Sequence, residues 1–187
     1  LEFKRVLFRS IVALARWTPA ALGAVWKSSP ALVVALVDVQ DPGNVGAVIR
    51  AADALGASGV AALDGTAHPG GWKALRGAMG STFRVPVARE QTDRAMGEMR
   101  RAGLRIVATV AASGTPLDRL DLRGPICLLL GNEGAGLPDS LSAGADERVT
   151  IPMRAGAESL NVAVTASLLL YEARRQRSSD FSVQSSE

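Results

Sequence analysis

The sequence predicts an α/β fold, a mostly parallel sheet with helices on both of its faces. From residue 31 onward, short apolar runs alternate with segments of helical period, which is the order in which a parallel sheet is built. Hydrophobic residues make up 48% of the 187 residues but aromatic residues only 4%. Such a composition suits helices that pack closely on a buried sheet. The length is sufficient for one domain with its own core.

The first strand is the clearest element. Residues 31–39, ALVVALVDV, form an unbroken apolar run rich in Val, which is typical of a strand buried on both faces. Apolar residues recur with helical spacing over 44–56, and Gly56 is placed to end that helix. The elements expected next are a strand at 58–63, a Gly/Pro loop at 65–71, a helix at Trp72–Gly80, a strand at Phe83–Val87 and a helix at Thr92–Gly103.

The second half of the chain continues the same alternation. The elements expected there are a strand at 104–110, a turn region through Pro116 and Pro125, a strand at 126–130, a helical turn at Pro138–Ala143, a strand at Glu147–Ile151 and a final helix at Leu160–Arg175. The sequence contains no internal repeat.

We expect one folded domain over residues 31–177. Residues 1–10 look foreign to the rest, and Arg5 to Ser10 resemble the in-frame translation of a sequencing adapter. We therefore interpret residues 1–10 as a non-native leader and exclude them from the fold. Residues 11–30 are predicted to be a connector or the remnant of a lost N-terminal domain, and 178–187 a polar tail.

Composition narrows the classes of function. The net charge of +3 mildly favours a polyanionic partner. The single cysteine, Cys127, lies inside an apolar run and is expected in the core, which excludes a disulfide framework. The single histidine, His68, is expected on a surface loop, and no set of metal ligands is present. Without a signal peptide or an apolar run near the ~18 residues of a membrane span, we expect a cytoplasmic protein with neither membrane nor metal.

Three glycine-punctuated segments carry polar residues that an α/β core does not need. The first, DPGNVGAVIRAADALGA (41–57), contains Asn44 and Arg50. A plain interpretation makes Asn44 a helix cap and Arg50 a solvated residue. The functional interpretation has both side chains project toward one sheet edge, where Arg50 clamps a phosphate or a ribose hydroxyl. The glycine spacing does not fit a dinucleotide-binding fingerprint.

The second and third segments have the same character. LLLGNEGAGLP (128–138) follows a buried strand and holds Glu133 among three glycines, whose backbone can approach a ligand closely or adopt positive φ. In IPMRAGAESLNVAVTASLLLYEA (151–173), Ser159 can cap the long helix with Asn161 in its first turn. Alternatively, these two residues hold a ligand or bond back to Glu133. Polar clusters at the ends of separate strands are how an α/β protein builds one site from distant sequence.

Together the three segments resemble the motifs of the SpoU (TrmH-like) class of the SPOUT superfamily, S-adenosyl-L-methionine-dependent RNA 2′-O-ribose methyltransferases. The segment RGAMGSTFRVPV (76–87) resembles a stretch that these enzymes carry between the first and second motifs. The resemblance covers about residues 32–175. It implies a parallel sheet whose C-terminal part is threaded into a trefoil knot, a homodimer, and a cofactor held in the knot.

The resemblance also implies roles for individual residues. The catalytic set would be Asn44, Arg50, Glu133, Ser159 and Asn161, and the cofactor-binding set would be Leu130, Gly131, Ile151, Pro152 and Leu160. We favour Arg50 as a clamp on the target phosphate and an electrostatic partner of the developing alkoxide, because a guanidinium with a pKa above ~12 is a poor base. Glu133 would orient Arg50 or Asn44, and Ser159 and Asn161 would hold the ribose.

The expected activity is methyl transfer to a ribose 2′-hydroxyl of RNA, with ribosomal RNA favoured over transfer RNA. A non-catalytic RNA-binding or ribosome-assembly module on the same fold is the alternative, and an unrelated doubly wound nucleotide-binding protein is a third option that lacks a phosphate-loop lysine. Eight arginines are candidates for RNA phosphate contacts, although ordinary solvated charges fit most of them equally well: Arg76, Arg84, Arg100, Arg101, Arg154, Arg174, Arg175 and Arg177.

Overall fold

The computed structural model describes residues 16–154, 156 and 159–178. Its centre is a seven-stranded sheet in the order β3-β2-β1-β6-β4-β7-β5, with every strand pair parallel. The strands are β1 (Leu32–Leu36), β2 (Gly59–Ala62), β3 (Val87–Arg89), β4 (Arg105–Thr109), β5 (Thr115–Pro116), β6 (Ile126–Leu130) and β7 (Glu147–Thr150). The predicted α/β class and parallel sheet are confirmed.

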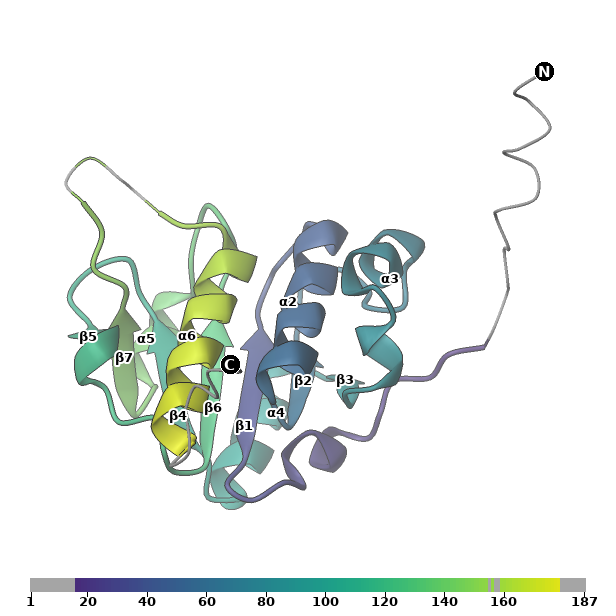
Figure 1. Ribbon diagram of the computed structural model, residues 1–187, viewed down its shortest axis with the longest axis horizontal. Coiled ribbons are helices and arrows are strands. Elements are labelled where there is room, and N and C mark those ends of the chain that lie inside the picture. Colours follow the sequence, from purple (N-terminus) through teal and green to yellow (C-terminus); the bar gives the residue numbers. More distant parts are fainter. Residues whose placement is uncertain (1–15, 155, 157–158, 179–187) are drawn as a thin grey trace, which may run out of the picture.

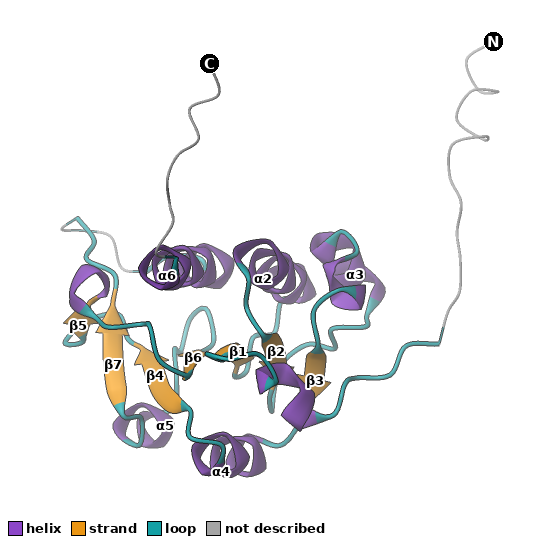
Figure 2. Ribbon diagram, turned by 60° about the horizontal axis from the view of Figure 1, so that its bottom comes forward, coloured by secondary structure: helices purple, strands orange, loops and turns teal. Residues whose placement is uncertain are grey.

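Helices cover both faces of the sheet, as predicted. In Figure 2, α2 (Pro42–Leu55), α3 (Trp72–Ala78) and α6 (Val162–Arg177) lie on one face, and α4 (Thr92–Arg101) and α5 (Asp139–Ala143) on the other. Figure 1 shows α6 and α2 side by side across the middle of the sheet. The strand order is compatible with a C-terminal trefoil knot, and the knot itself stays a prediction.

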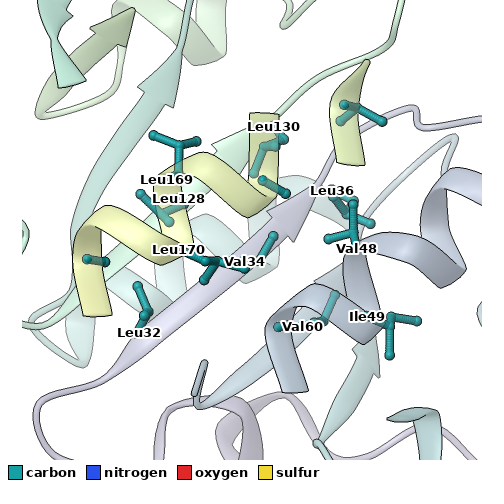
Figure 3. Close-up of a cluster of buried hydrophobic side chains, with 14 of the residues drawn as sticks. Leu32, Val34, Leu36, Val48, Ile49, Val60, Leu128, Leu130, Leu169 and Leu170 are labelled. Atoms are coloured by element: carbon teal, nitrogen blue, oxygen red, sulfur yellow. The ribbon is translucent and has the colours of Figure 1, made fainter. Parts of the chain in front are cut away.

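The two faces of β1 explain why its sequence is an unbroken apolar run. Leu32, Val34 and Leu36 point toward α2 and α6, where they pack with leucines of β6 and α6 (Figure 3). The residues between them, Val33 and Ala35, belong to a second core cluster on the α4 face. Because side chains alternate across a strand, burial on both faces requires an apolar residue at every position.

The ends of α2 follow from local chemistry, and one predicted cap is wrong. The Asp41 side chain, not Asn44, caps the helix by accepting a hydrogen bond from the Gly43 amide at 2.6 Å, and Pro42 follows in the first turn. A cap residue must have extended backbone before the first turn, and Asn44 is already helical. Gly56 ends the helix with φ 80°, as predicted.

Two parts of the chain differ from the predicted elements. The strand expected at Phe83–Val87 begins only at Val87, because Ser81–Phe83 forms a 3₁₀ turn and Pro86 lacks an amide donor. Residues 16–30, for which no element was predicted, include the 3₁₀ helix η1 (Leu22–Trp26), whose Leu22 and Val25 are buried on the α4 face. The short β5 and the 3₁₀ helix η3 (Leu117–Arg119) lie in the region predicted as turn. The proposed leader, residues 1–10, lies outside the described residues, as does most of the polar tail.

Close contact between α2 and α3 depends on a glycine. A Cβ atom on Gly46 would lie 2.2 Å from the Ala74 carbonyl oxygen and 2.9 Å from the Ala78 amide nitrogen, both backbone atoms. We therefore expect Gly46→Ala to lower the free energy of unfolding by about 3 kcal/mol, because the two helices must separate. Urea titration measures this. Gly23→Ala is the matched control, because nothing lies within 4 Å of its added Cβ, and similar losses in both variants would contradict the prediction.

Candidate functional site

The three polar segments meet at the carboxyl ends of the central strands. The segment containing Asn44 follows β1, the one containing Glu133 follows β6, and the one containing Asn161 leads from β7 into α6. Since β1 and β6 are parallel neighbours in register from Leu32 and Ile126 onward, the loops after them leave the sheet side by side. This is the edge at which open α/β sheets bind their ligands.

A chain of hydrogen bonds joins one residue from each segment. The Asn44 amide donates from Nδ2 to Glu133 Oε1 at 2.8 Å, and Asn161 donates from Nδ2 to Asn44 Oδ1 at 3.0 Å. Asn44 is thus held from both ends of its side chain by residues 89 and 117 positions away. Of the partners predicted for Glu133, the structure gives it Asn44. The alternative in which Asn161 bonds back to Glu133 is wrong, because the Asn161 amide donates to Asn44 instead.

Asn161 also fixes the start of α6. Its Oδ1 accepts hydrogen bonds from the Ala163 and Val164 amides at 2.9 and 3.4 Å, which makes Asn161 the helix cap. The alternative in which Ser159 caps this helix is wrong, since the first helical residue is Val162. The side-chain amide of Asn161 thus makes both contacts: its oxygen caps α6 and its nitrogen donates to Asn44. In this way Asn161 connects the start of α6 to the first turn of α2.

Asn132 builds the loop that carries Glu133, and sequence reasoning missed it. Its Nδ2 donates to the Asp38 backbone oxygen at 2.9 Å and to Asp38 Oδ2 at 3.2 Å, while its Oδ1 accepts from the Gly134 and Ala135 amides. Its backbone pairs in both directions with Gly136. An Asn two positions after a strand and closely flanked by glycines was the available signal, because Asn favours such turns.

At two of the three glycine positions in this loop, the backbone geometry explains why the residue is glycine. A Cβ on Gly131 would lie 2.4 Å from the carbonyl carbon and oxygen of Gly136, so the loop closes on itself at that point. Gly136 has φ 72°, which favours glycine. Gly134 meets only the Asn132 side chain, at 3.6 Å.

A cavity of about 510 Å³ opens beside this loop. It is lined by Leu130, Gly131, Ile151 and Leu160, four of the five residues predicted to bind the cofactor, and also by Glu133 and Ser159. Pro152 is not among the lining residues, although its neighbours Ile151 and Met153 are. The volume lies within the range of small-molecule sites, and the mixture of aliphatic side chains and loop backbone is typical of them.

Arg50 stands apart from the hydrogen-bonded chain. It is exposed on α2, six residues after Asn44, and six helical residues turn a side chain by about 120° net around the axis. The two side chains therefore leave the helix in different directions. No hydrogen bond or ion pair of Arg50 is present within the described part of the chain. Its predicted place beside the ribose stays a prediction.

The remaining candidates behave as the plain interpretations expected. Cys127 is buried on β6, and burial raises the pKa of its thiol to about 12. His68 is exposed on its loop, with its ring edge-on to Trp17 and its Nδ1 accepting from the Gly70 amide.

Across residues 16–154, 156 and 159–178 no cluster of three or more His, Cys, Asp or Glu side chains could hold a metal ion. Over the same ranges no helix combines the length and apolar character that spanning a membrane requires.

Most of the arginines considered for phosphate contacts have partners within the molecule. Arg84 pairs with Asp53, Arg175 with Glu172, and Arg177 donates to four backbone carbonyl groups, of Leu122, Pro30, Ala31 and Gly124. Arg100 and Arg174 each donate to one carbonyl, of Gly144 and Ala54 respectively. Arg76 instead lies over the Trp72 ring. Arg177 thus ties the end of α6 to the loops beneath it, a structural rather than a ligand-binding role.

Comparison with known proteins assigns this geometry to a family. The family model described as the SpoU rRNA Methylase family matches residues 31–171. The 23S rRNA (guanosine(2553)-2′-O)-methyltransferase RlmP of Bacillus subtilis is 39% identical over 163 residues, which cover 84% of this chain and 66% of that protein. An uncharacterized tRNA/rRNA methyltransferase of Mycobacterium avium is 39% identical over 83% of this chain and 51% of its own length. The chain thus spans between half and two thirds of these relatives.

Solved structures share the fold. An AdoMet-bound rRNA methyltransferase from Sinorhizobium meliloti superposes with a TM-score of 0.79 at 40% identity, over 86% of this chain and 61% of that one. The SpoU methyltransferase AviRb from Streptomyces viridochromogenes, in complex with AdoMet, gives a TM-score of 0.79 at 36% identity, over 86% and 66% of the two chains.

Proposed function

Because the chain belongs to the SpoU rRNA methylase family, we propose that it catalyses the S-adenosyl-L-methionine-dependent methylation of a ribose 2′-hydroxyl in RNA. One observation carries the proposal: Asn44 donates a hydrogen bond to Glu133 and accepts one from Asn161, and these two bonds join all three motif segments beside one cavity. A non-catalytic RNA-binding module would not require this polar set at the mouth of a small-molecule cavity, so the enzyme is favoured over that alternative.

The cavity fits the cofactor in size and in the character of its lining. Leu130, Gly131, Ile151 and Leu160 would hold S-adenosylmethionine, with Pro152 next to the wall. Glycine at 131 leaves backbone rather than a side chain on that wall, which suits recognition by main-chain groups. When bound, the cofactor supplies an electrophilic methyl carbon whose transfer to the 2′-oxygen leaves a thioether and releases the hydroxyl proton.

The polar residues of the chain would then position the RNA. We assign Arg50 to the target phosphate and to the negative charge that develops on the 2′-oxygen, a role for which the planar guanidinium is suited. Glu133 holds Asn44, and Asn44 with Ser159 and Asn161 would face the ribose hydroxyls. Orientation of the hydroxyl accounts for much of the rate acceleration in such a reaction, because a correctly placed nucleophile does not lose translational and rotational entropy at the reacting step.

Ribosomal RNA is the favoured substrate class, since RlmP and the Sinorhizobium meliloti protein are named for that RNA.

We also propose a homodimer. Its support is a stripe of exposed apolar residues on and just before α6, made of Leu160, Val164, Leu168 and Tyr171, because an apolar stripe of this kind favours protein association. A cytoplasmic location and the assignment of residues 31–177 as the catalytic domain follow from the same proposal.

The proposal predicts a strict requirement for the ribose hydroxyl. Purified protein with labelled S-adenosylmethionine is expected to transfer methyl groups to ribosomal RNA from cells that lack the gene, and the all-deoxy analogue of the modified segment is expected to accept none. Mapping of 2′-O-methyl sites in cells with and without the gene then identifies the nucleotide. Label found on a base, or equal transfer to the deoxy analogue, would overturn a ribose target.

A further inference from the structure

The strongest feature outside the site is an exposed aromatic surface on α3 and the 3₁₀ turn η2 (Ser81–Phe83) that follows it. Trp72, Met79 and Phe83 are 63%, 67% and 65% exposed, the largest fractions among the large hydrophobic side chains of the described residues. Nothing in the fold accounts for placing them in water. We call Trp72, Arg76, Met79 and Phe83 the α3 platform.

The platform is cationic as well as aromatic. The guanidinium carbon of Arg76 lies 5.4 Å from the centroid of the Trp72 ring, a cation–π contact that holds both side chains in place. Lys73 is exposed on the same helix. Between Asp64 and Glu90 the chain carries Lys73, Arg76, Arg84 and Arg89 and no acidic residue, whereas the whole chain has a net charge of only +3. Lys73 and Arg76 therefore give the platform a positive charge, whereas Arg84 is paired with Asp53.

Short contacts connect the platform to the site. The first turn of α2, which carries Asn44, packs directly on α3: a Cβ on Gly77 would lie 3.0 Å from the Gly43 carbonyl oxygen. Arg84, the residue after η2, donates hydrogen bonds to Asp53 of α2 at 2.7 Å and to Ser81 of η2 at 2.8 Å. These two bonds fix η2 to α2. Arg50 lies one helical turn before Asp53. An RNA strand bound at Arg50 would therefore cross α2 toward the α3 platform.

We propose that the α3 platform binds single-stranded RNA next to the target nucleotide, stacking an unpaired base on Trp72 or Phe83 and pairing Lys73 and Arg76 with phosphates. This rests on the proposed function. Exposed aromatic rings with interleaved cations suit unpaired nucleotides, because every base offers a π face and the backbone offers the charge. A duplex hides its bases and loses the stacking part of this recognition.

A second copy of the chain is the rival occupant, and the charge argues against it. A twofold interface centred on the platform would bring Lys73 and Arg76 close to the same residues of the partner, and like charges there repel. The stripe on α6 is free of this repulsion, since its four members are uncharged. The two exposed surfaces therefore differ in kind: the α6 stripe suits protein, and the α3 platform suits an anionic, aromatic ligand.

Trp72→Ala tests the proposal. It is expected to weaken binding of a short labelled RNA single strand about tenfold, because stacking contributes most of the contact, and Trp72→Phe, which keeps a ring, is expected to retain most of the affinity. Arg76→Ala is expected to reduce the slope of log affinity against log salt by about 0.7, the loss of one phosphate contact on a single strand. Arg94→Ala, at an exposed arginine of α4 across the sheet that is not among the candidates for phosphate contact, is the matched control and should change neither quantity.

Three outcomes separate the possible failures. Unchanged single-strand affinity and unchanged KM for RNA in Trp72→Ala, with wild-type methyl transfer intact, would overturn the platform and leave the proposed function standing. A shift in sedimentation of Trp72→Ala without a change in RNA affinity would assign the surface to a second copy and overturn it as well. Absence of methyl transfer by the wild type would refute the proposed function instead, while the binding titrations still decide the platform. Circular dichroism confirms that each variant is folded.

Discussion

Arg50→Lys is expected to slow methyl transfer by about a hundredfold while the affinity for S-adenosylmethionine changes little. Lysine keeps the positive charge but loses the planar fork that can hold a phosphate with two parallel hydrogen bonds. Arg50 lies outside the residues that line the cavity, so cofactor binding should not depend on it. Single-turnover rates with RNA, together with cofactor titration in its absence, measure the two quantities separately.

The control for this substitution is Arg94→Lys, which makes the same chemical change at an exposed position of α4 on the opposite face of the sheet. That variant should keep both the rate and the affinity. If Arg50→Lys lost cofactor affinity and rate in equal proportion, Arg50 would be acting on the cofactor or on the fold, and the assignment to the target phosphate would be wrong. A loss confined to KM for RNA would reduce Arg50 to a binding contact.

Much of this fold could be predicted from the sequence, because its central strands are buried on both faces and their sequences are therefore continuous apolar runs. The prediction for β6 is exact, 126–130, and Gly56 was identified as the end of α2. Residues 16–30 escaped prediction because their packing depends on partners elsewhere. Leu22 and Val25 make no periodic pattern of their own and are buried where η1 packs on β1, β2 and β3.

The site could be predicted as a set of segments but not as a network. Polar residues at strand ends identified Asn44, Glu133 and Asn161, since parallel strands bring their carboxyl ends to one edge. The order of their hydrogen bonds depends on side-chain geometry, and the sequence left Glu133 with several possible partners. The contact between Asn132 and Asp38 was missed because it joins residues 94 positions apart, and no local pattern reports such a pairing.

Asn44→Asp is expected to cut methyl transfer by about a hundredfold through the hydrogen-bond network, since Asn44 itself does not line the cofactor cavity. The new carboxylate would face Glu133 Oε1, which accepts a hydrogen bond from the Asn44 amide at 2.8 Å. Two ionised carboxylates at that distance repel, and neither can donate a hydrogen bond to the other. The contact with Asn161 survives, because Asn161 is the donor there. Steady-state kinetics with ribosomal RNA measures the loss.

A second substitution distinguishes repulsion from loss of a reacting group. In the double variant Asn44→Asp, Glu133→Gln, the glutamine amide can donate to the new aspartate, so the same bond re-forms with its direction reversed. Since Asn161 still donates to position 44, the chain of three residues is complete again, and we expect at least about tenfold recovery over the single variant. Glu133→Gln alone keeps an acceptor for Asn44 and should be mild. If the double variant were instead as slow as the product of the two single effects, Glu133 would be needed for its charge near the reacting atoms, and its role as the residue that positions Asn44 would be refuted.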